Sequence, residues 1–298
     1  NPNPSLPLLA VAIHTKLILL HTHTGTEEEM NEIQRLFAVA PETAKGATAE
    51  AVAERTTEQA EDDRSSAAAK QIKQLKRWSR LCIDVGRRVK VVSWHHKGDY
   101  FATVAFDSSH NSVLIHRVSK AQTQSPFSKN KGKVQVVSFH PTKPFFFVAS
   151  QRNIRIYNLA DQQLAKKLLC PAKWISSLDV HPGGDHLIVG SYDRRVCWYD
   201  LDLSSTPYKT LKYHNKAVRQ VSFSRNYPLF ASCSDDGKLH IFHGMVYTDL
   251  LTNPLIVPVK ILEAHKPVGD LGALNCMFHP TQPWVFSSGA DGVARLFT

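Results

Sequence analysis

The feature that most limits how this chain can fold is a short motif that recurs five times. In each copy an apolar residue at the end of a predicted strand is followed by a loop-forming element. The copies are Trp94-His95-His96, Phe139-His140-Pro141, Val180-His181-Pro182, Phe223-Ser224-Arg225 and Phe278-His279-Pro280. Counted from their second residues, they lie 45, 41, 43 and 55 residues apart. This period is typical of four-stranded propeller blades and predicts an all-β repeat protein with a binding surface rather than a catalytic centre.

The fourth copy indicates the order of strands within one blade. Residues 217–223 alternate as a first strand, and residues 229–233 follow as a second strand after a turn. Asp235-Asp236-Gly237-Lys238 then predicts a tight hairpin that leads into a third strand at residues 239–242. The other copies have the same order of strands.

Several positions of these repeats resemble the WD-repeat family. In that family a His, a Ser, the hairpin Asp and a Trp form a hydrogen-bonded tetrad inside each blade, and the resemblance gives two sets here a structural role: His214, Ser232 and Asp236, and His265, Ser287 and Asp291. The Trp position holds Tyr157, Tyr199, Phe242 or Phe297. Because Phe has no N–H donor, we expect the networks of Phe242 and Phe297 to stop at three members.

The number of blades predicts an incomplete ring. Residues 8–13 and 16–20 are predicted as a second and a third strand with no first strand before them, and Thr298 follows directly after a third strand. Six partial or complete blades are consistent with a WD-repeat β-propeller that has seven blades in the intact protein. We therefore expect residues 1–298 to be one domain that lacks an N-terminal blade and a half, and a natural chain that extends before Asn1.

Two insertions interrupt the period. The first, residues 24–76, is predicted to be partly helical, with Met30, Ile33 and Phe37 on one face, and partly disordered where it is rich in Ala, Thr and Glu. The second, residues 245–255, accounts for the long step of 55 residues. It is apolar enough to pack either on its own blade or on another protein.

Composition excludes several classes of protein. No apolar run is long enough to span a membrane, so we expect no membrane partner. The odd set of five cysteines contains no Cys-x-x-Cys pair, which predicts reduced thiols in a cytosolic or nuclear protein. No metalloprotease, nucleophile-elbow or phosphate-loop motif is present, so we expect no enzyme and no cofactor. His21-Thr-His23 and His95-His96 lack a further ligand at the spacing of a metal site.

The charge of the chain is strongly positive and unevenly distributed. The net charge is +10, and residues 91–298 alone carry 23 bases against 14 acids, a net charge of +9. In a propeller, the hairpins between second and third strands and the links between blades share one face, here called the top face. The bases expected there, and proposed to contact nucleic acid, are Lys129, Lys131, Lys133, Arg152, Lys173, Arg194, Arg195, Lys216 and Lys238. Contact with RNA phosphates and an incidental solvated surface both remain open.

Longer stretches resemble one WD-repeat family in particular. They are residues 124–127, 145–150, 173–177, 243–254 and 278–292. These stretches resemble the C-terminal propeller of the block-of-proliferation (Erb) family, and the resemblance covers the chain except residues 24–76. The family resemblance implies a non-enzymatic nucleolar and nucleoplasmic scaffold for large ribosomal subunit (60S) assembly and precursor rRNA processing.

The same resemblance implies specific partners. They are a WD-repeat protein of the Ytm family, a pescadillo-type protein that binds mainly through sequence before Asn1, and the precursor large subunit with its rRNA. A WD-repeat adaptor outside ribosome biogenesis is the alternative function that the sequence leaves open.

Overall fold

The computed structural model describes residues 8–13, 16–21, 80–85, 88–105, 112–120, 122–127, 132–247 and 255–298. Over these ranges the chain forms six antiparallel sheets and no helix, and so no helix that could span a membrane. The predicted insertion at residues 24–76 lies outside the described residues, as do residues 248–254 of the second insertion. The all-β prediction is confirmed.

The described chain divides into two compact units, and residues 1–131 form the first. Its strands are β1 (Leu8–Ile13), β2 (Lys16–His21), β3 (Arg80–Asp84), β4 (Val89–Trp94), β5 (Tyr100–Ala105), β6 (Val113–Arg117) and β7 (Gln122–Gln124). Strands β1, β2 and β3 form one sheet in that order, and β4 to β7 form another. The strand that follows the first insertion, β3, therefore pairs with β2 as the fourth strand of its blade.

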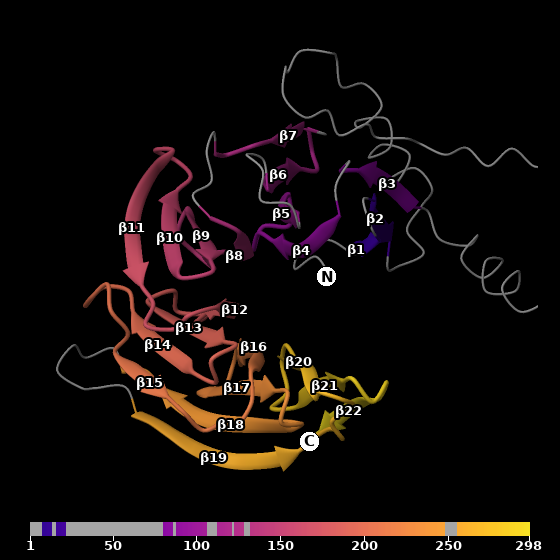
Figure 1. The fold of residues 1–298 in the computed structure, drawn as a ribbon. Helices are drawn as coiled ribbons and strands as arrows, with labels where there is room; N and C mark the ends of the chain where they lie inside the picture. Colours follow the sequence, from indigo (N-terminus) through magenta and orange to yellow (C-terminus); the bar gives the residue numbers. More distant parts are fainter. Residues whose placement is uncertain are drawn as a thin grey trace, which may run out of the picture. The chain divides into compact units, whose positions relative to one another are not determined.

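The second unit, residues 132–298, holds the other four sheets (Figure 1). Its strands are β8 (Val134–Phe139), β9 (Phe145–Ser150), β10 (Asn153–Asn158), β11 (Gln163–Leu169), β12 (Ile175–Val180), β13 (His186–Ser191), β14 (Val196–Asp200), β15 (Lys209–Leu211), β16 (Val218–Phe223), β17 (Leu229–Ser234), β18 (Lys238–Met245), β19 (Leu255–Glu263), β20 (Ala273–Phe278), β21 (Val285–Gly289) and β22 (Ala294–Phe297). Three sheets have four strands, and β20 to β22 form a three-stranded sheet. Within every sheet, strands that follow one another in sequence are paired.

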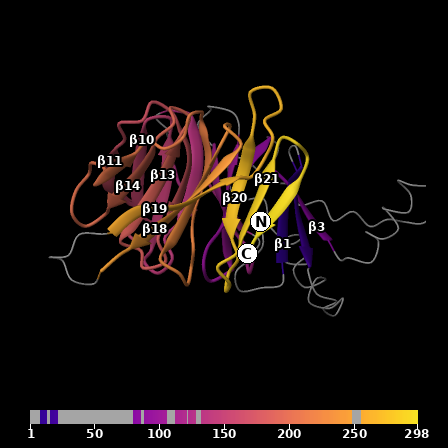
Figure 2. The same cartoon turned by 90° about the horizontal axis from the view of Figure 1, so that it is seen from below.

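Successive sheets of the second unit pack side by side, as blades of a β-propeller do. The first strands β8, β12, β16 and β20 lie next to one another in chain order, and the sheets are stacked along the unit (Figure 2). Apolar clusters fill the space between neighbours. In one of them Trp198 of β14 contacts Phe223 and Phe230 of the next sheet, with ring centroids 5.3 and 5.4 Å apart. Both faces of an inner blade are therefore buried.

The first strand of five sheets carries the same irregularity. A register shift of one residue lies between its first and third residues in β4, β8, β12, β16 and β20. Such bulges bend a strand and increase its twist. The repeat is thus preserved in the backbone as well as in the sequence.

The recurring motif itself stabilises the turn between the first and second strands. The ring Nδ1 of His140 accepts hydrogen bonds from the backbone N–H groups of Thr142 and Lys143, at 3.1 and 2.8 Å. His95, His181 and His279 accept equivalent bonds from residues two positions later. In the fourth copy, Ser224 Oγ takes over this role with the N–H of Tyr227. The motif residues are therefore caps of turns, which explains their regular spacing.

Four cysteines, Cys170, Cys197, Cys233 and Cys276, are free thiols, and three of them are buried. This agrees with the prediction from composition. The fifth, Cys82, is not among the residues whose side chains are described.

A carboxylate joins two neighbouring blades. Asp179 of β12 accepts a hydrogen bond from its neighbour Val180 at 2.9 Å and one from the backbone N–H of Phe223, on β16, at 2.7 Å. Burial raises the pKa of Asp179 to about 6, although these two hydrogen bonds and the charge of Arg225 oppose the shift. The ionised form of Asp179 is thus less favourable in the folded protein than in the unfolded chain.

We expect Asp179→Asn to remove a pH-dependent component of stability. Because the folded-state pKa lies above the unfolded value, the stabilisation by this group is present below about pH 4 and is lost as the pH rises through about 6. The free energy of unfolding of the wild type should therefore fall over this range, relative to the variant, by at most about 3 kcal/mol. Denaturant unfolding at several pH values measures this difference. Asp202→Asn, at an exposed position, is the control, and an equal pH dependence in wild type and Asp179→Asn would contradict the assignment.

Candidate functional site

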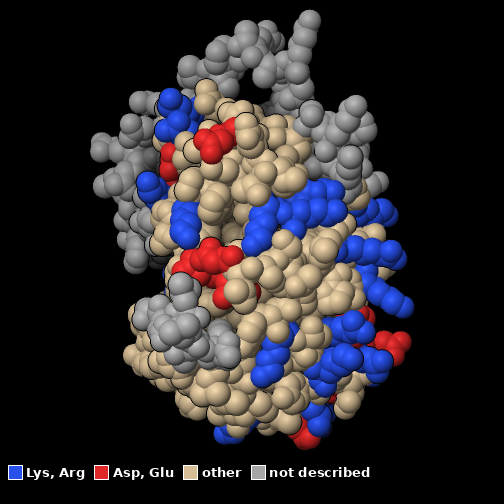
Figure 3. Space-filling view, turned by 90° about the vertical axis from the view of Figure 1, so that its left-hand side faces the viewer, with Lys and Arg blue, Asp and Glu red and all other residues tan. Residues whose placement is uncertain are grey.

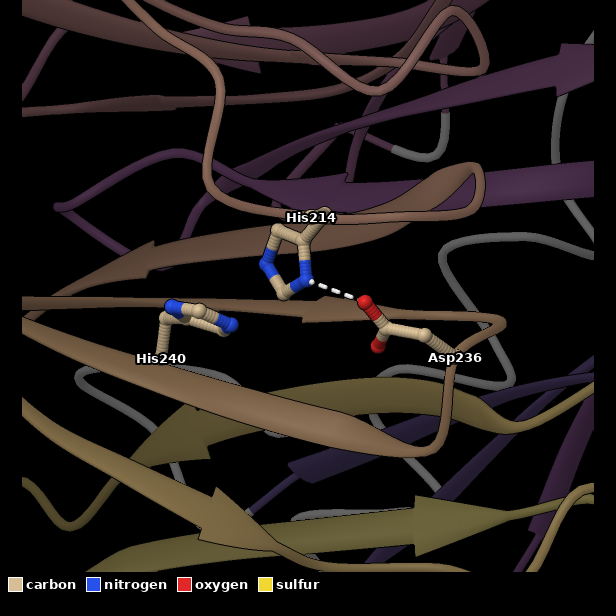
Figure 4. A group of neighbouring side chains, drawn as sticks. All are labelled: His214, Asp236 and His240. Carbon is tan, nitrogen blue, oxygen red and sulfur yellow. Dashed lines mark hydrogen bonds and ion pairs between the residues drawn. The ribbon is translucent and has the colours of Figure 1, made fainter.

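One polar network links the β15–β16 connection to the β17–β18 hairpin. His214 lies in the connection, and its Nε2 is 2.7 Å from Ser232 Oγ on β17. Its Nδ1 is 3.2 Å from Asp236 Oδ2 in the hairpin (Figure 4). Asp236 also accepts hydrogen bonds from the backbone N–H groups of Asn215 and Lys238. The structure thus brings together the first predicted set of three side chains.

The next blade repeats this arrangement. His265 Nε2 lies 2.8 Å from Ser287 Oγ, and its Nδ1 lies 2.9 Å from Asp291 Oδ1. The His265 side chain is fully enclosed, like that of His214. Both networks stop at three members, with Phe242 and Phe297 at the position where WD repeats usually carry Trp.

The first network also depends on a glycine. Gly237 has φ of +78°, and a Cβ atom there would lie 2.1 Å from the carbonyl oxygen of His265. That backbone conformation and that close approach both require glycine. The hairpin is consequently fixed against the connection that carries His265.

Both networks are suited to structure rather than to catalysis. Burial alone would raise the pKa of Asp236, but its hydrogen bond and charge interaction with His214 outweigh burial and lower the pKa to about 2. The carboxylate is therefore ionised and held by its partners at neutral pH. Each network ties a connecting loop to a hairpin and so shapes the top face.

The bases predicted to contact nucleic acid differ in exposure and in whether an acid pairs with them. Lys129 and Lys131 lie outside the described residues. Arg152 and Arg194 lie in the β9–β10 and β13–β14 hairpins, and Lys133 and Lys173 precede β8 and β12. Lys133, Arg152, Lys173 and Arg194 are all exposed. No ion pair involves any of the four within the described part of the chain.

The other three bases of the predicted set are engaged with acids. Arg195 lies 3.5 Å from Asp193 and also donates to the carbonyl of Pro171. Lys216 and Lys238 lie 3.9 and 3.7 Å from the carboxylates of Asp270 and Glu263. These pairs reduce the positive charge that the three residues offer to a ligand, although exposed pairs of this kind are weak.

Backbone hydrogen bonds place three of the accessible bases in one cluster. The N–H of Ile175 donates to the carbonyl of Gln151, directly before Arg152, at 2.9 Å. The N–H of Tyr192 donates to the carbonyl of Trp174 at 2.9 Å, and the N–H of Lys173 donates to Asp193 at 3.3 Å. These bonds join the segments that carry Arg152, Lys173 and Arg194. We name these three bases the rim cluster.

Two exposed aromatic rings accompany the rim cluster, and sequence reasoning did not single them out. Trp174 and Tyr192 are 47% and 36% exposed, and their rings meet edge to face with centroids 6.2 Å apart. Arg219 lies over the Tyr192 ring at 5.0 Å and is held in place by Asp235, at 2.7 Å. The only signal for Trp174 in the sequence is its place beside Lys173 in a stretch that resembles the family.

A base on the opposite side of the blades is paired with an acid. Lys143 lies 3.1 Å from Asp185, and its hydrogen bond and charge interaction with that carboxylate raise the pKa of the lysine. Figure 3 shows Lys and Arg gathered toward one side of the face in view and Asp and Glu in smaller separate groups. On this face the positive charge is therefore unevenly distributed.

Comparison with known proteins identifies the repeats. Residues 162–200, 205–243 and 256–298 match the WD domain, G-beta repeat family. These ranges fall in the second unit, which also contains both histidine networks. The WD-repeat prediction is confirmed.

Similar proteins align with most or all of the chain. "Ribosome biogenesis protein bop1-B" of Xenopus laevis is 50% identical over 306 residues, which is 100% of this chain and 39% of the relative. "Ribosome biogenesis protein BOP1" of Homo sapiens is 48% identical over 300 residues, 100% of this chain and 38% of the relative. "Ribosome biogenesis protein ERB1" of Debaryomyces hansenii is 60% identical over 217 residues, 72% of this chain and 27% of the relative. The chain thus spans well under half of the length of these relatives.

We expect Ser232→Ala to destabilise the fold by about 1–3 kcal/mol, because it leaves the buried Nε2 of His214 without its hydrogen-bond partner. Ser287→Ala should have a similar effect through His265. Denaturant unfolding gives the free energies. Ser222→Ala is the control, since that hydroxyl makes only a 3.4 Å bond to the carbonyl of Phe223. Equal unfolding free energies for Ser232→Ala and Ser222→Ala would contradict a stabilising role for the network.

Proposed function

Since the chain belongs to the block-of-proliferation (Erb) family of WD-repeat proteins, we propose that it is a non-enzymatic scaffold in large ribosomal subunit assembly. The observation that carries this proposal is the identity of 48–60% to relatives that are named ribosome biogenesis proteins. A scaffold role suits a repeat fold, because blades offer a broad surface built from loops and hairpins. We propose the nucleolus and nucleoplasm as its location.

Within this role, we propose that the rim cluster contacts precursor rRNA. Arg152, Lys173 and Arg194 carry positive charge that no acid neutralises by an ion pair in the described part of the chain. Trp174 and Tyr192 provide exposed rings beside them. Proteins that bind single-stranded RNA combine basic residues, which contact phosphates, with aromatic rings, on which bases stack. A further exposed base, Lys133, precedes β8.

The protein partners in this proposal come from the family resemblance. They are a WD-repeat protein of the Ytm family and a pescadillo-type protein. The histidine networks support the same role indirectly, because they fix the loops from which a binding surface is made. The alternative, an adaptor outside ribosome biogenesis, is not favoured by the relatives.

The RNA proposal predicts weaker binding when the charge of the rim cluster is reversed. Replacing Arg152, Lys173 and Arg194 with Glu should reduce the affinity for large-subunit precursor rRNA. The slope of log affinity against log salt should also fall by roughly one for each phosphate that the variant no longer binds. Fluorescence anisotropy at several salt concentrations measures both quantities. Stability should change by about 0.5 kcal/mol or less per site, because the side chains lie at the surface.

The matched control replaces Lys97, Lys143 and Arg225 with Glu and changes the net charge equally. Equal weakening in both triple variants would mean that only net charge matters, and the rim cluster would not be an RNA site. Recovery of large-subunit precursors with the affinity-purified protein tests the scaffold role separately. Purification without such precursors would contradict that role.

A further inference from the structure

His240, on β18, is a buried histidine that the repeat does not explain. Its side chain is 3% exposed, and its Nδ1 has no hydrogen-bond partner within the described residues. It follows the hairpin Asp236 by four positions, and the equivalent residue after Asp291 is Arg295, which is exposed. The His214 network therefore has a buried imidazole beside it, and the His265 network has an exposed arginine at the same position. A buried polar atom without a partner is costly, and a ligand bound to this atom would offset that cost.

His240 lies against the network of His214 and Asp236. Its ring centroid is 4.2 Å from that of His214, and the two rings meet edge to face. One ligand atom from each of His214, Asp236 and His240 can be chosen so that all three lie within 4.8 Å of one another. Figure 4 shows a ring nitrogen of His240 turned toward the carboxylate of Asp236. The three residues come from a loop, a hairpin and a strand, so only the fold brings them together.

The protonation states suit a cation. Burial lowers the pKa of His240 to about 4, so its imidazole is neutral and keeps a free electron pair at neutral pH. Asp236 contributes a carboxylate, a common zinc ligand. The cluster thus offers one negative oxygen and imidazole nitrogens, a donor set that favours zinc and related divalent transition metals.

We propose that His214, Asp236 and His240 form a zinc-binding site, with a water molecule as the fourth ligand. In it, Nδ1 of His214, a carboxylate oxygen of Asp236 and a ring nitrogen of His240 coordinate the ion. The His214 ring then carries its proton on Nε2, which donates to Ser232 Oγ, 2.7 Å away. A ligand histidine that donates its other N–H to a neighbouring polar group is the usual arrangement in zinc proteins.

A tetrahedral site requires the ligand atoms to move closer together. Zinc ligands lie about 2.0–2.2 Å from the metal, so two ligands of a tetrahedral site are about 3.3–3.6 Å apart. The 3.2 Å between Nδ1 of His214 and Oδ2 of Asp236 is close to this separation. The three ligand atoms together lie within 4.8 Å, so the His240 ring has to move toward the other two when the metal binds. No hydrogen bond within the described residues restrains the Nδ1 of His240. The ion would then tie strand β18 to the β15–β16 connection.

The test uses the whole protein, stripped of metal with a chelator and then titrated with Zn²⁺ or with Co²⁺ as a spectroscopic probe. Wild type should bind about one more metal ion per chain than His240→Phe, and bound Co²⁺ should give the visible absorption of a tetrahedral site. Zn²⁺ should also raise the thermal midpoint of the wild type and not that of His240→Phe. Arg295→Phe, the same change at the equivalent position of the other network, is the control and should bind like the wild type.

His240→Cys keeps a zinc ligand at this position. It should retain the extra metal ion and add a thiolate-to-cobalt absorption band, which no structural role of His240 would produce. Unfolding in chelator, without metal, shows whether each variant is folded. Equal metal stoichiometry in wild type and His240→Phe, or no tetrahedral Co²⁺ signal in the wild type and in His240→Cys, would overturn the proposal. Neither result would affect the proposed scaffold function.

Discussion

Burial of both faces of each inner blade against its neighbours is the constraint on which the rest of the second unit depends. A single four-stranded sheet cannot cover its own apolar side chains, so Phe230 of one blade packs on Trp198 of the preceding one. The same need recurs at every junction between inner blades. First strands must therefore lie next to one another, and their shared bulge gives them a similar twist.

Packing between blades involves mainly the strands, so polar interactions hold the loops and hairpins in place. The His214 and His265 networks each join a connection between blades to a hairpin, and Gly237 allows the backbone of its hairpin to approach His265. On the opposite side, ring nitrogens such as that of His140 cap the turns between first and second strands. Apolar packing between blades therefore stabilises the interior, and polar hydrogen-bond networks order the loops and hairpins.

The ordered loops account for the rim cluster and its aromatic neighbours. Arg152, Lys173 and Arg194 are far apart in sequence, and the bonds of Ile175 to Gln151 and of Tyr192 to Trp174 bring their loops together. The charge of Arg219 is directed inward, to the buried Asp235. A count of bases on the top face therefore overstates the charge available to a ligand, because a sequence does not indicate which bases are already paired.

The all-β class, the repeat period and the positions of most strands could be predicted from the sequence, and the resemblance to WD repeats added the members of both histidine networks. These features depend on local alternation and on residue types at fixed spacing, which are visible in one dimension. Three features could be found only in the folded chain. Asp179 bonds to the next blade, and Trp174 and Tyr192 accompany the rim cluster. His240 is buried beside Asp236, with its Nδ1 unpaired among the described residues. Each of these features depends on contacts between segments that lie at varying distances along the sequence, and on the burial that those contacts produce. The periodicity of residues within one strand indicates neither the contacts nor the burial.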